Sequence, residues 1–92
     1  MIERRQFYIN GAWVDPAKAR DFPVIDPSTE EECAVISLGD HSDTDAAVAA
    51  ARAAFEGWSQ TSRAERKELI EAIFAAYEAR SEEMSQAISM EM

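Results

Sequence analysis

The sequence is poor in the residues from which most catalytic and cofactor sites are built. Its 92 residues include one cysteine, one histidine and three glycines. A single cysteine cannot form an internal disulfide, and this favours a reducing compartment such as the cytoplasm. The glycines, at positions 11, 39 and 57, form no Gly-x-Gly-x-x-Gly or other phosphate-binding loop. The chain on its own is therefore not predicted to bind a dinucleotide.

Basic residues and long apolar runs are also scarce. Nine Lys and Arg stand against 18 Asp and Glu, which gives a formal net charge of -9. This balance argues against nucleic acid and against an anionic membrane surface, because both need clustered Lys and Arg. No apolar run approaches the length that crosses a bilayer, and no apolar segment follows Met1 to make a signal peptide. We expect neither a nucleic-acid nor a membrane partner.

What is present is typical of one small globular domain. Hydrophobic residues make up 47% of the chain, which is a globular rather than a disordered composition. A compact chain of this size buries roughly 60–65% of its unfolded surface, and so we expect a small core.

The first 38 residues have the pattern of strands and turns. Two short apolar runs, 7–9 and 12–14, are joined by Asn-Gly, the strongest short-range hairpin signal. A second pair of runs, 22–25 and 33–36, surrounds a turn-like Asp-Pro-Ser-Thr. The pattern predicts two β-hairpins.

From residue 42 the apolar period changes from two to 3.6, which predicts helices. We expect a first helix over 43–56, with Ser42 and Asp45 as a near capping box and Gly57 just past its end. Ser62 and Glu65 form a full capping box for a second helix. A third helix is expected from residue 81, with two acids in its first turn.

The pattern of the third helix continues through the final residues, 90–92. Nothing after Ile88 stops a helix, since no Gly, Asn or Pro follows it. We expect the chain to be part of a longer protein, cut by design or by proteolysis.

Three stretches of the chain occur in an order that points to a family. They are FYINGAWV, FPVIDPSTEE and AAVAAARAAFEGW, and they resemble the N-terminal segment of the NAD(P)-dependent aldehyde dehydrogenases. The resemblance covers residues 7–92. It implies a fold that is an α+β fragment: two N-terminal β-hairpins followed by three α-helices, as part of the α/β cofactor-binding domain. Residues 1–92 would be its truncated N-terminal part, with hairpins over 1–38 and helices over 42–92.

The resemblance also implies an activity that this chain does not complete. The full family oxidises an aldehyde to a carboxylic acid by attack of a cysteine thiolate and hydride transfer to NAD or NADP, and it forms homo-oligomers. Its catalytic cysteine lies in a Gly-Gln-x-Cys stretch far downstream. Its general-base Glu, oxyanion Asn and cofactor-contacting strands also lie beyond Met92. We therefore expect no catalytic and no cofactor-binding residue in this chain.

Four side chains that could suggest chemistry have simpler explanations. Cys33 lies in a strand-like Glu-Cys-Ala-Val with no neighbouring basic residue, which favours an inert strand cysteine over a nucleophile. His41 has no second ligand or nucleophile beside it, which favours a solvated loop residue. Trp13 and Trp58 suit packing of strand against helix better than ligand stacking, because no basic residues accompany them.

Glu91 breaks its local pattern, because it shares a helical face with Met84, Ala87 and Ile88. It is either a frayed, exposed end or a carboxylate with a buried partner. The resemblance implies a partner: many aldehyde dehydrogenases hold a monovalent cation with a backbone carbonyl in the segment that 22–25 matches. They add an acid near the end of the helix that 88–91 matches. We expect Val24, through its carbonyl, and Glu91 to be ligands of that cation, with a third ligand outside this chain.

An alternative of a different class stays open at this point. A small acidic α+β protein-interaction module could present its third helix to a groove on a partner. A continuation into a long α/β sequence would favour the enzyme, whereas a natural stop after Met92 would favour the module.

Overall fold

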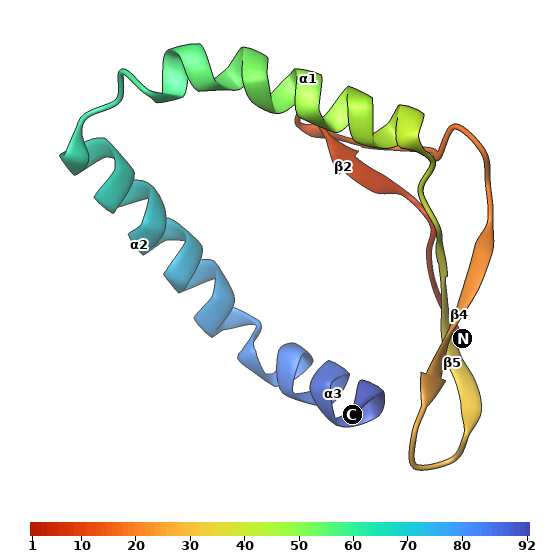
Figure 1. Cartoon of the computed structure of the whole chain (residues 1–92). Helices are drawn as coiled ribbons and strands as arrows, with labels where there is room; N and C mark the ends of the chain where they lie inside the picture. Colours follow the sequence, from red (N-terminus) through yellow and green to blue (C-terminus); the bar gives the residue numbers. More distant parts are fainter.

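Five short strands and three helices form an open arch in a computed structural model that describes residues 1–92 (Figure 1). Helix α1 leaves the strands, α2 runs back, and α3 ends beside the sheet. This is the α+β chain with three helices that the sequence predicts. No helix has the length and apolar character needed to cross a membrane. The elements are β1 Ile2–Arg4, β2 Phe7–Ile9, β3 Ala12–Val14, β4 Asp21–Asp26, β5 Glu31–Ser37, α1 His41–Trp58, α2 Arg63–Ala79 and α3 Ser81–Glu91.

Strands β2 and β3 form an antiparallel pair closed by Asn10 and Gly11. Ile9 pairs with Ala12, as the Asn-Gly turn predicts. Asn10 has a φ of 54° and Gly11 a φ of 77°, the left-handed values that a two-residue type I′ turn requires. The expectation of a two-residue turn at this position is confirmed.

Strand β5 is the centre of a three-stranded sheet in the order β1-β5-β4. It pairs antiparallel with β4 and parallel with β1. The apolar pattern of the sequence does not predict β1. Its three exposed residues carry no apolar pattern, and a parallel pairing depends on a partner far along the chain.

The β4–β5 ladder contains a bulge. Val24 pairs with Ala34, but Ile25 pairs with Glu32, so Cys33 is an extra residue on β5. An extra residue of this kind bends its strand and redirects side chains.

The ends of α1 differ from the sequence expectation. The N-cap is Asp40, which forms a reciprocal capping box with Asp43, so the expected box of Ser42 and Asp45 is wrong. Asp caps a helix as well as Ser does, and the earlier acid shifts the helix start to His41. Gly57 lies inside α1 rather than after it.

The other two helices begin where the sequence predicts. Glu65 N–H donates to Ser62 Oγ at 3.1 Å, and Ser62 N–H donates to Glu65 Oε2 at 3.2 Å. This confirms the capping box of α2. Helix α3 begins at Ser81, with Glu82 and Glu83 in its first turn.

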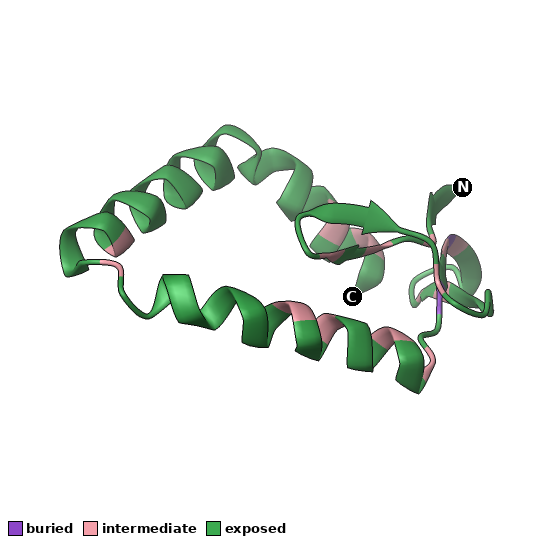
Figure 2. Cartoon of the chain, turned by 90° about the horizontal axis from the view of Figure 1, so that it is seen from above, coloured by how far each residue is buried: buried purple, intermediate pink, exposed green.

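The expected small core is absent. Only Ala34 and Ser37 are buried, and almost the whole ribbon is exposed in Figure 2. The radius of gyration is 16.9 Å, against about 12 Å for a compact chain of this length. The apolar stripes of the helices exist, but no second layer of secondary structure lies opposite them. The apolar pattern correctly predicts which helix faces are hydrophobic. It does not show whether this chain contains the residues that would pack against them.

Replacing Gly11 by Val should weaken the β2–β3 pair by about 1–2 kcal/mol, because a β-branched residue resists a left-handed φ. Gly11→Asn is the matched control, since Asn tolerates that conformation and should cost much less. The population of the pair can be followed by NMR through the contact of Tyr8 with Trp13, whose ring centroids are 5.2 Å apart. Equal populations in Gly11→Val and the native chain would mean that another turn type is used.

Helix α1 should lose its first turn in acid. The hydrogen bond from His41 N–H holds the pKa of Asp40 below its ordinary value. A carboxyl with a lowered folded-state pKa stabilises the fold above its unfolded-state pKa of about 3.9, and this contribution is lost as pH falls through the lower folded-state value. Asp40→Asn keeps a capping side chain that does not titrate, and so it should reduce the acid-induced loss of helix signal in circular dichroism. An identical acid titration of both proteins would contradict the assignment.

Candidate functional site

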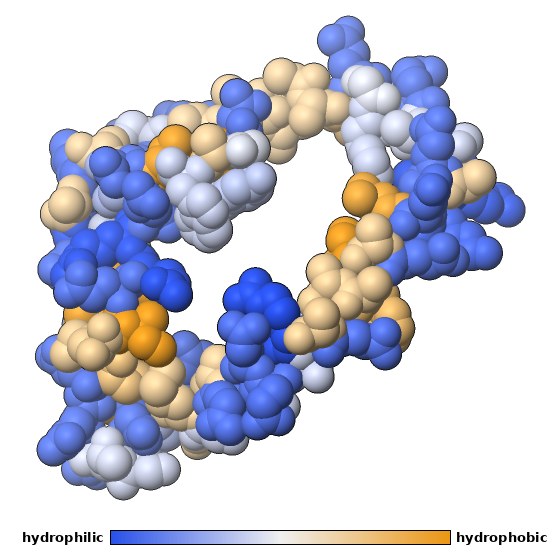
Figure 3. Space-filling model, turned by 180° about the vertical axis from the view of Figure 1, so that it is seen from behind, coloured by the Kyte–Doolittle hydropathy of each residue, from blue (hydrophilic) through white to orange (hydrophobic).

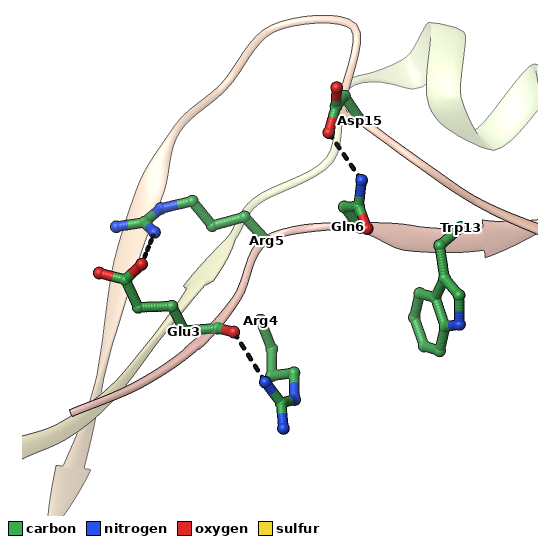
Figure 4. A pocket seen from close by; sticks show the side chains of 6 residues that line it. All are labelled: Glu3, Arg4, Arg5, Gln6, Trp13 and Asp15. Atoms are coloured by element: carbon green, nitrogen blue, oxygen red, sulfur yellow. Dashed lines mark hydrogen bonds and ion pairs between the residues drawn. The ribbon is translucent and has the colours of Figure 1, made fainter.

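A polar hollow of about 590 Å³ lies beside β1 and β3 (Figure 4). Its six lining residues are Glu3, Arg4, Arg5, Gln6, Trp13 and Asp15. Most of its polar groups are already paired. Arg5 contacts Glu3 at 2.9 Å and Asp21 at 2.8 Å, and Gln6 Nε2 donates to Asp15 at 3.0 Å. The guanidinium of Arg5 lowers the pKa of Asp21. The hollow is a structural ion-pair cluster and contains no nucleophile.

A second cavity, of about 470 Å³, lies between the three-stranded sheet and the end of the helical arm, which is the name used here for α2 and α3. Strands β1, β4 and β5 line one side, and the last turn of α2 with α3 lines the other. Val24 and Glu91, the two residues predicted to hold a cation, both line this cavity. Its lining is Ile2, Arg4, Val24, Ala34, Ile36, Tyr77, Arg80, Glu83, Met84, Ala87, Met90 and Glu91.

The Val24 side of the cavity is shaped by the bulge. Val24 is half-buried in β4, and its carbonyl accepts a hydrogen bond from the thiol of Cys33 at 3.4 Å. A carbonyl oxygen has two lone pairs, and a thiol is a weak donor. A carbonyl oxygen is a donor of the type that hard cations accept.

The Glu91 side supplies the one unpaired carboxylate of the cavity. Arg80 and Glu83 form a two-pronged ion pair, with Nε–Oε2 at 2.9 Å and Nη2–Oε1 at 3.2 Å. This contact lowers the pKa of Glu83 and raises that of Arg80. Glu91 has no ion-pair partner and is the last residue of α3. Of the two interpretations left open by the sequence, an exposed carboxylate describes Glu91 as this chain presents it.

These oxygen donors fit only part of a metal site. No group of three or more His, Cys, Asp or Glu side chains is arranged to hold a metal ion. One carbonyl and one carboxylate suit a hard, weakly charged cation and not zinc. Arg4 also lines the cavity and is the rival partner for Glu91, although the two form no ion pair.

The other candidate residues are not brought together. Cys33 is half-buried, and its thiol bonds only the Val24 carbonyl. His41 was predicted to lie in a loop, but it is the first residue of α1. Its Nδ1 lies 3.0 Å from Asp40 Oδ1. Trp13 and Trp58 are 65% and 47% exposed, so neither packs strand against helix as expected. The chain holds no nucleophile–base pair.

Two features of the second cavity were missed by the sequence reasoning. The Arg80–Glu83 pair has a local signal in its three-residue spacing on a helix. The bond from Cys33 to Val24 has none, because it depends on the bulge in the β4–β5 ladder.

Comparisons with known proteins agree on one family. The model of the aldehyde dehydrogenase family matches residues 13–92. A 3-succinoylsemialdehyde-pyridine dehydrogenase of a Pseudomonas species is 48% identical over the whole chain. A crystal structure of an aldehyde dehydrogenase from Bartonella henselae superposes on the whole chain with a TM-score of 0.98 and 54% identity. A mutant of aldehyde dehydrogenase C from Pseudomonas syringae, complexed with NAD+ and octanal, matches 96% of the chain with a TM-score of 0.93 and 46% identity.

The chain is much shorter than these proteins. It spans 19% of the Pseudomonas relative, 19% of the Bartonella chain and 18% of the Pseudomonas syringae chain.

Proposed function

Because the chain belongs to the aldehyde dehydrogenase family and corresponds to the N-terminal part of such an enzyme, we propose that it is a scaffold within the cofactor-binding domain of the whole protein. The whole protein would oxidise an aldehyde to a carboxylic acid with NAD or NADP. The observation that carries this proposal is the TM-score of 0.98 over the full length of the chain. Family membership leaves no reason to retain a free-standing interaction module.

The residues of this chain do not fit a dinucleotide. Neither cavity is closed by a glycine-rich turn at a helix N-terminus, which is the arrangement that binds a pyrophosphate. The strand pairs β2–β3 and β4–β5 and the three helices would instead support the cofactor-binding part of the protein from outside. NAD+ and octanal are bound by the Pseudomonas syringae relative, and that complex supports NAD(P) and an aldehyde as ligands of the whole protein.

Assembly and location belong to the same proposal. We propose, from the resemblance to the family, that the whole protein is a homo-oligomer, and we keep the cytoplasmic location that the free thiol of Cys33 favours.

The second cavity is where this chain would add a function of its own. We propose that the Val24 carbonyl and the Glu91 carboxylate are two ligands of a monovalent structural cation in the whole protein. Both groups line one cavity, and Glu83 already neutralises Arg80 beside them. The cation would hold the end of α3 against β4 and would take no part in the reaction.

The isolated chain should show no dehydrogenase activity, since it holds no nucleophile–base pair and no phosphate loop. The measurement is NAD(P)H formation with octanal and with short aldehydes. The positive control is a hybrid enzyme, in which this chain replaces the matching 19% of the Pseudomonas relative. Turnover by the isolated chain that survives Cys33→Ala would place a catalytic site within these residues.

The hybrid enzyme should be more stable in sodium or potassium than in a bulky organic cation. A ligand at 100 times its dissociation constant stabilises a fold by about 2.7 kcal/mol, which is a shift of several degrees in melting temperature. Glu91→Gln should abolish this difference, whereas Glu82→Gln on the same helix should keep it.

A separate variant distinguishes the cation from the rival ion pair. If Glu91 bonds Arg4 instead, Arg4→Gln would lower the melting temperature in every salt. A melting temperature of the native hybrid that is independent of the cation would contradict the site.

A further inference from the structure

Arg4 is the one residue that lines both the polar hollow and the second cavity. It is the last residue of β1, and its Nη1 donates to the backbone carbonyl of Glu3 at 3.1 Å (Figure 4). That carbonyl is neutral, and Arg4 forms no ion pair. The neighbouring Arg5, in contrast, contacts two carboxylates. The guanidinium of Arg4 is therefore an unpaired charge at the boundary of two hollows.

The charged groups of the second cavity leave one opposite charge for Arg4. Its lining contains two guanidinium groups, of Arg4 and Arg80, and two carboxylates, of Glu83 and Glu91. Arg80 and Glu83 neutralise each other through hydrogen bonds of 2.9 and 3.2 Å. In Figure 3, strongly hydrophilic side chains lie on both borders of the central opening, among apolar ones. Arg4 on the sheet and Glu91 on the arm are the two lining charges that remain unpaired.

A guanidinium and a monovalent cation answer the same need at Glu91. The carboxylate shares the cavity with apolar side chains such as Met84 and Ala87, where a positive partner stabilises it. Helix α3 contains no Lys or Arg of its own. Arg carries five N–H donors and no acceptor, so it bonds the same oxygens that a hard cation binds. Among the residues of the cavity, Arg4 is the side chain that can replace the cation.

We propose that Arg4 competes with the monovalent cation for Glu91. The guanidinium pairs with the carboxylate when no cation is bound, and it turns back to the polar hollow when the cation binds. The inference rests on the proposed function, because it takes Val24 and Glu91 to be ligands of that cation. In the hollow, Asp15 is an acceptor for the displaced guanidinium, since its carboxylate bonds only the side chain of Gln6.

A competitor and a permanent ion pair have different consequences for stability. A permanent pair stabilises the protein in every salt. A competitor stabilises it only where the cation is missing, and it lowers the apparent affinity for the cation by the fraction of molecules in which Arg4 holds Glu91. The dependence of stability on the cation therefore distinguishes the two roles of Arg4.

The test is thermal unfolding of the hybrid enzyme while potassium replaces tetramethylammonium at constant ionic strength, which keeps charge screening the same. Arg4→Gln should lower the potassium concentration at the midpoint of the stabilisation by about two- to fivefold, as expected for an exposed pair. Its melting temperature should fall in tetramethylammonium and stay at the native value in saturating potassium. Arg4→Lys keeps the charge and should shift the midpoint less.

Arg52→Gln is the matched control, because Arg52 lies on α1 and lines neither cavity. It removes the same charged group and should leave the potassium midpoint unchanged. A double-mutant cycle of Arg4→Gln and Glu91→Gln adds a readout that a merely structural arginine would not give. We expect the two substitutions to be coupled in tetramethylammonium and additive in saturating potassium.

Two results would overturn the inference and leave the cation site standing. They are a native potassium midpoint in Arg4→Gln, and an equal fall of its melting temperature in both salts. Failure of the cation site has a different signature: the melting temperatures of the native hybrid and of both single variants would be independent of potassium. That result would refute the site and the competition together.

Discussion

The carboxylate of Asp43 joins the strands to the first turn of α1, and the direction in which the helices leave the sheet depends on it. Its Oδ1 accepts from Ala17 N–H at 3.0 Å, and its Oδ2 accepts from Asp40 N–H at 2.9 Å. One side chain thus connects the loop after β3, the exit from β5 and the first turn of α1. Arg20 strengthens the same joint by donating to the Gly39 carbonyl at 2.8 Å. The acid also lies where the helix dipole favours it.

Because this joint is polar and local, it can set direction without a hydrophobic core. The capping boxes of α1 and α2 and the turn at Asn10 and Gly11 are of the same kind. Local contacts of this type define where elements begin and end, but they do not fix the distance between α2 and the sheet. That distance requires a packed layer, which this chain lacks. The arch is therefore a shape that belongs to a larger body.

The difference between local contacts and long-range packing explains how much of the fold could be predicted from the sequence. The Asn-Gly turn and the box of Ser62 and Glu65 are read within a few residues, and both are correct. The cap of α1 was misplaced because two possible capping boxes overlap there, Asp40 with Asp43 and Ser42 with Asp45, and the local pattern does not decide between them. Strand β1 was missed because its pairing with β5 is non-local. The core was wrongly expected because the surface law for compact monomers assumes that a chain covers its own apolar faces.

The second cavity shows the same limit in the candidate site. The family resemblance selected Val24 and Glu91, and pattern alone left Glu91 undecided between a frayed end and a buried ligand. Their placement at one cavity depends on α3 lying against β4. The extra residue Cys33 then turns its thiol onto the Val24 carbonyl. A thiol is a weak hydrogen-bond donor, and a carbonyl oxygen has two lone pairs. In the proposed cation site, the bulge is the feature that places this weak donor at the Val24 carbonyl.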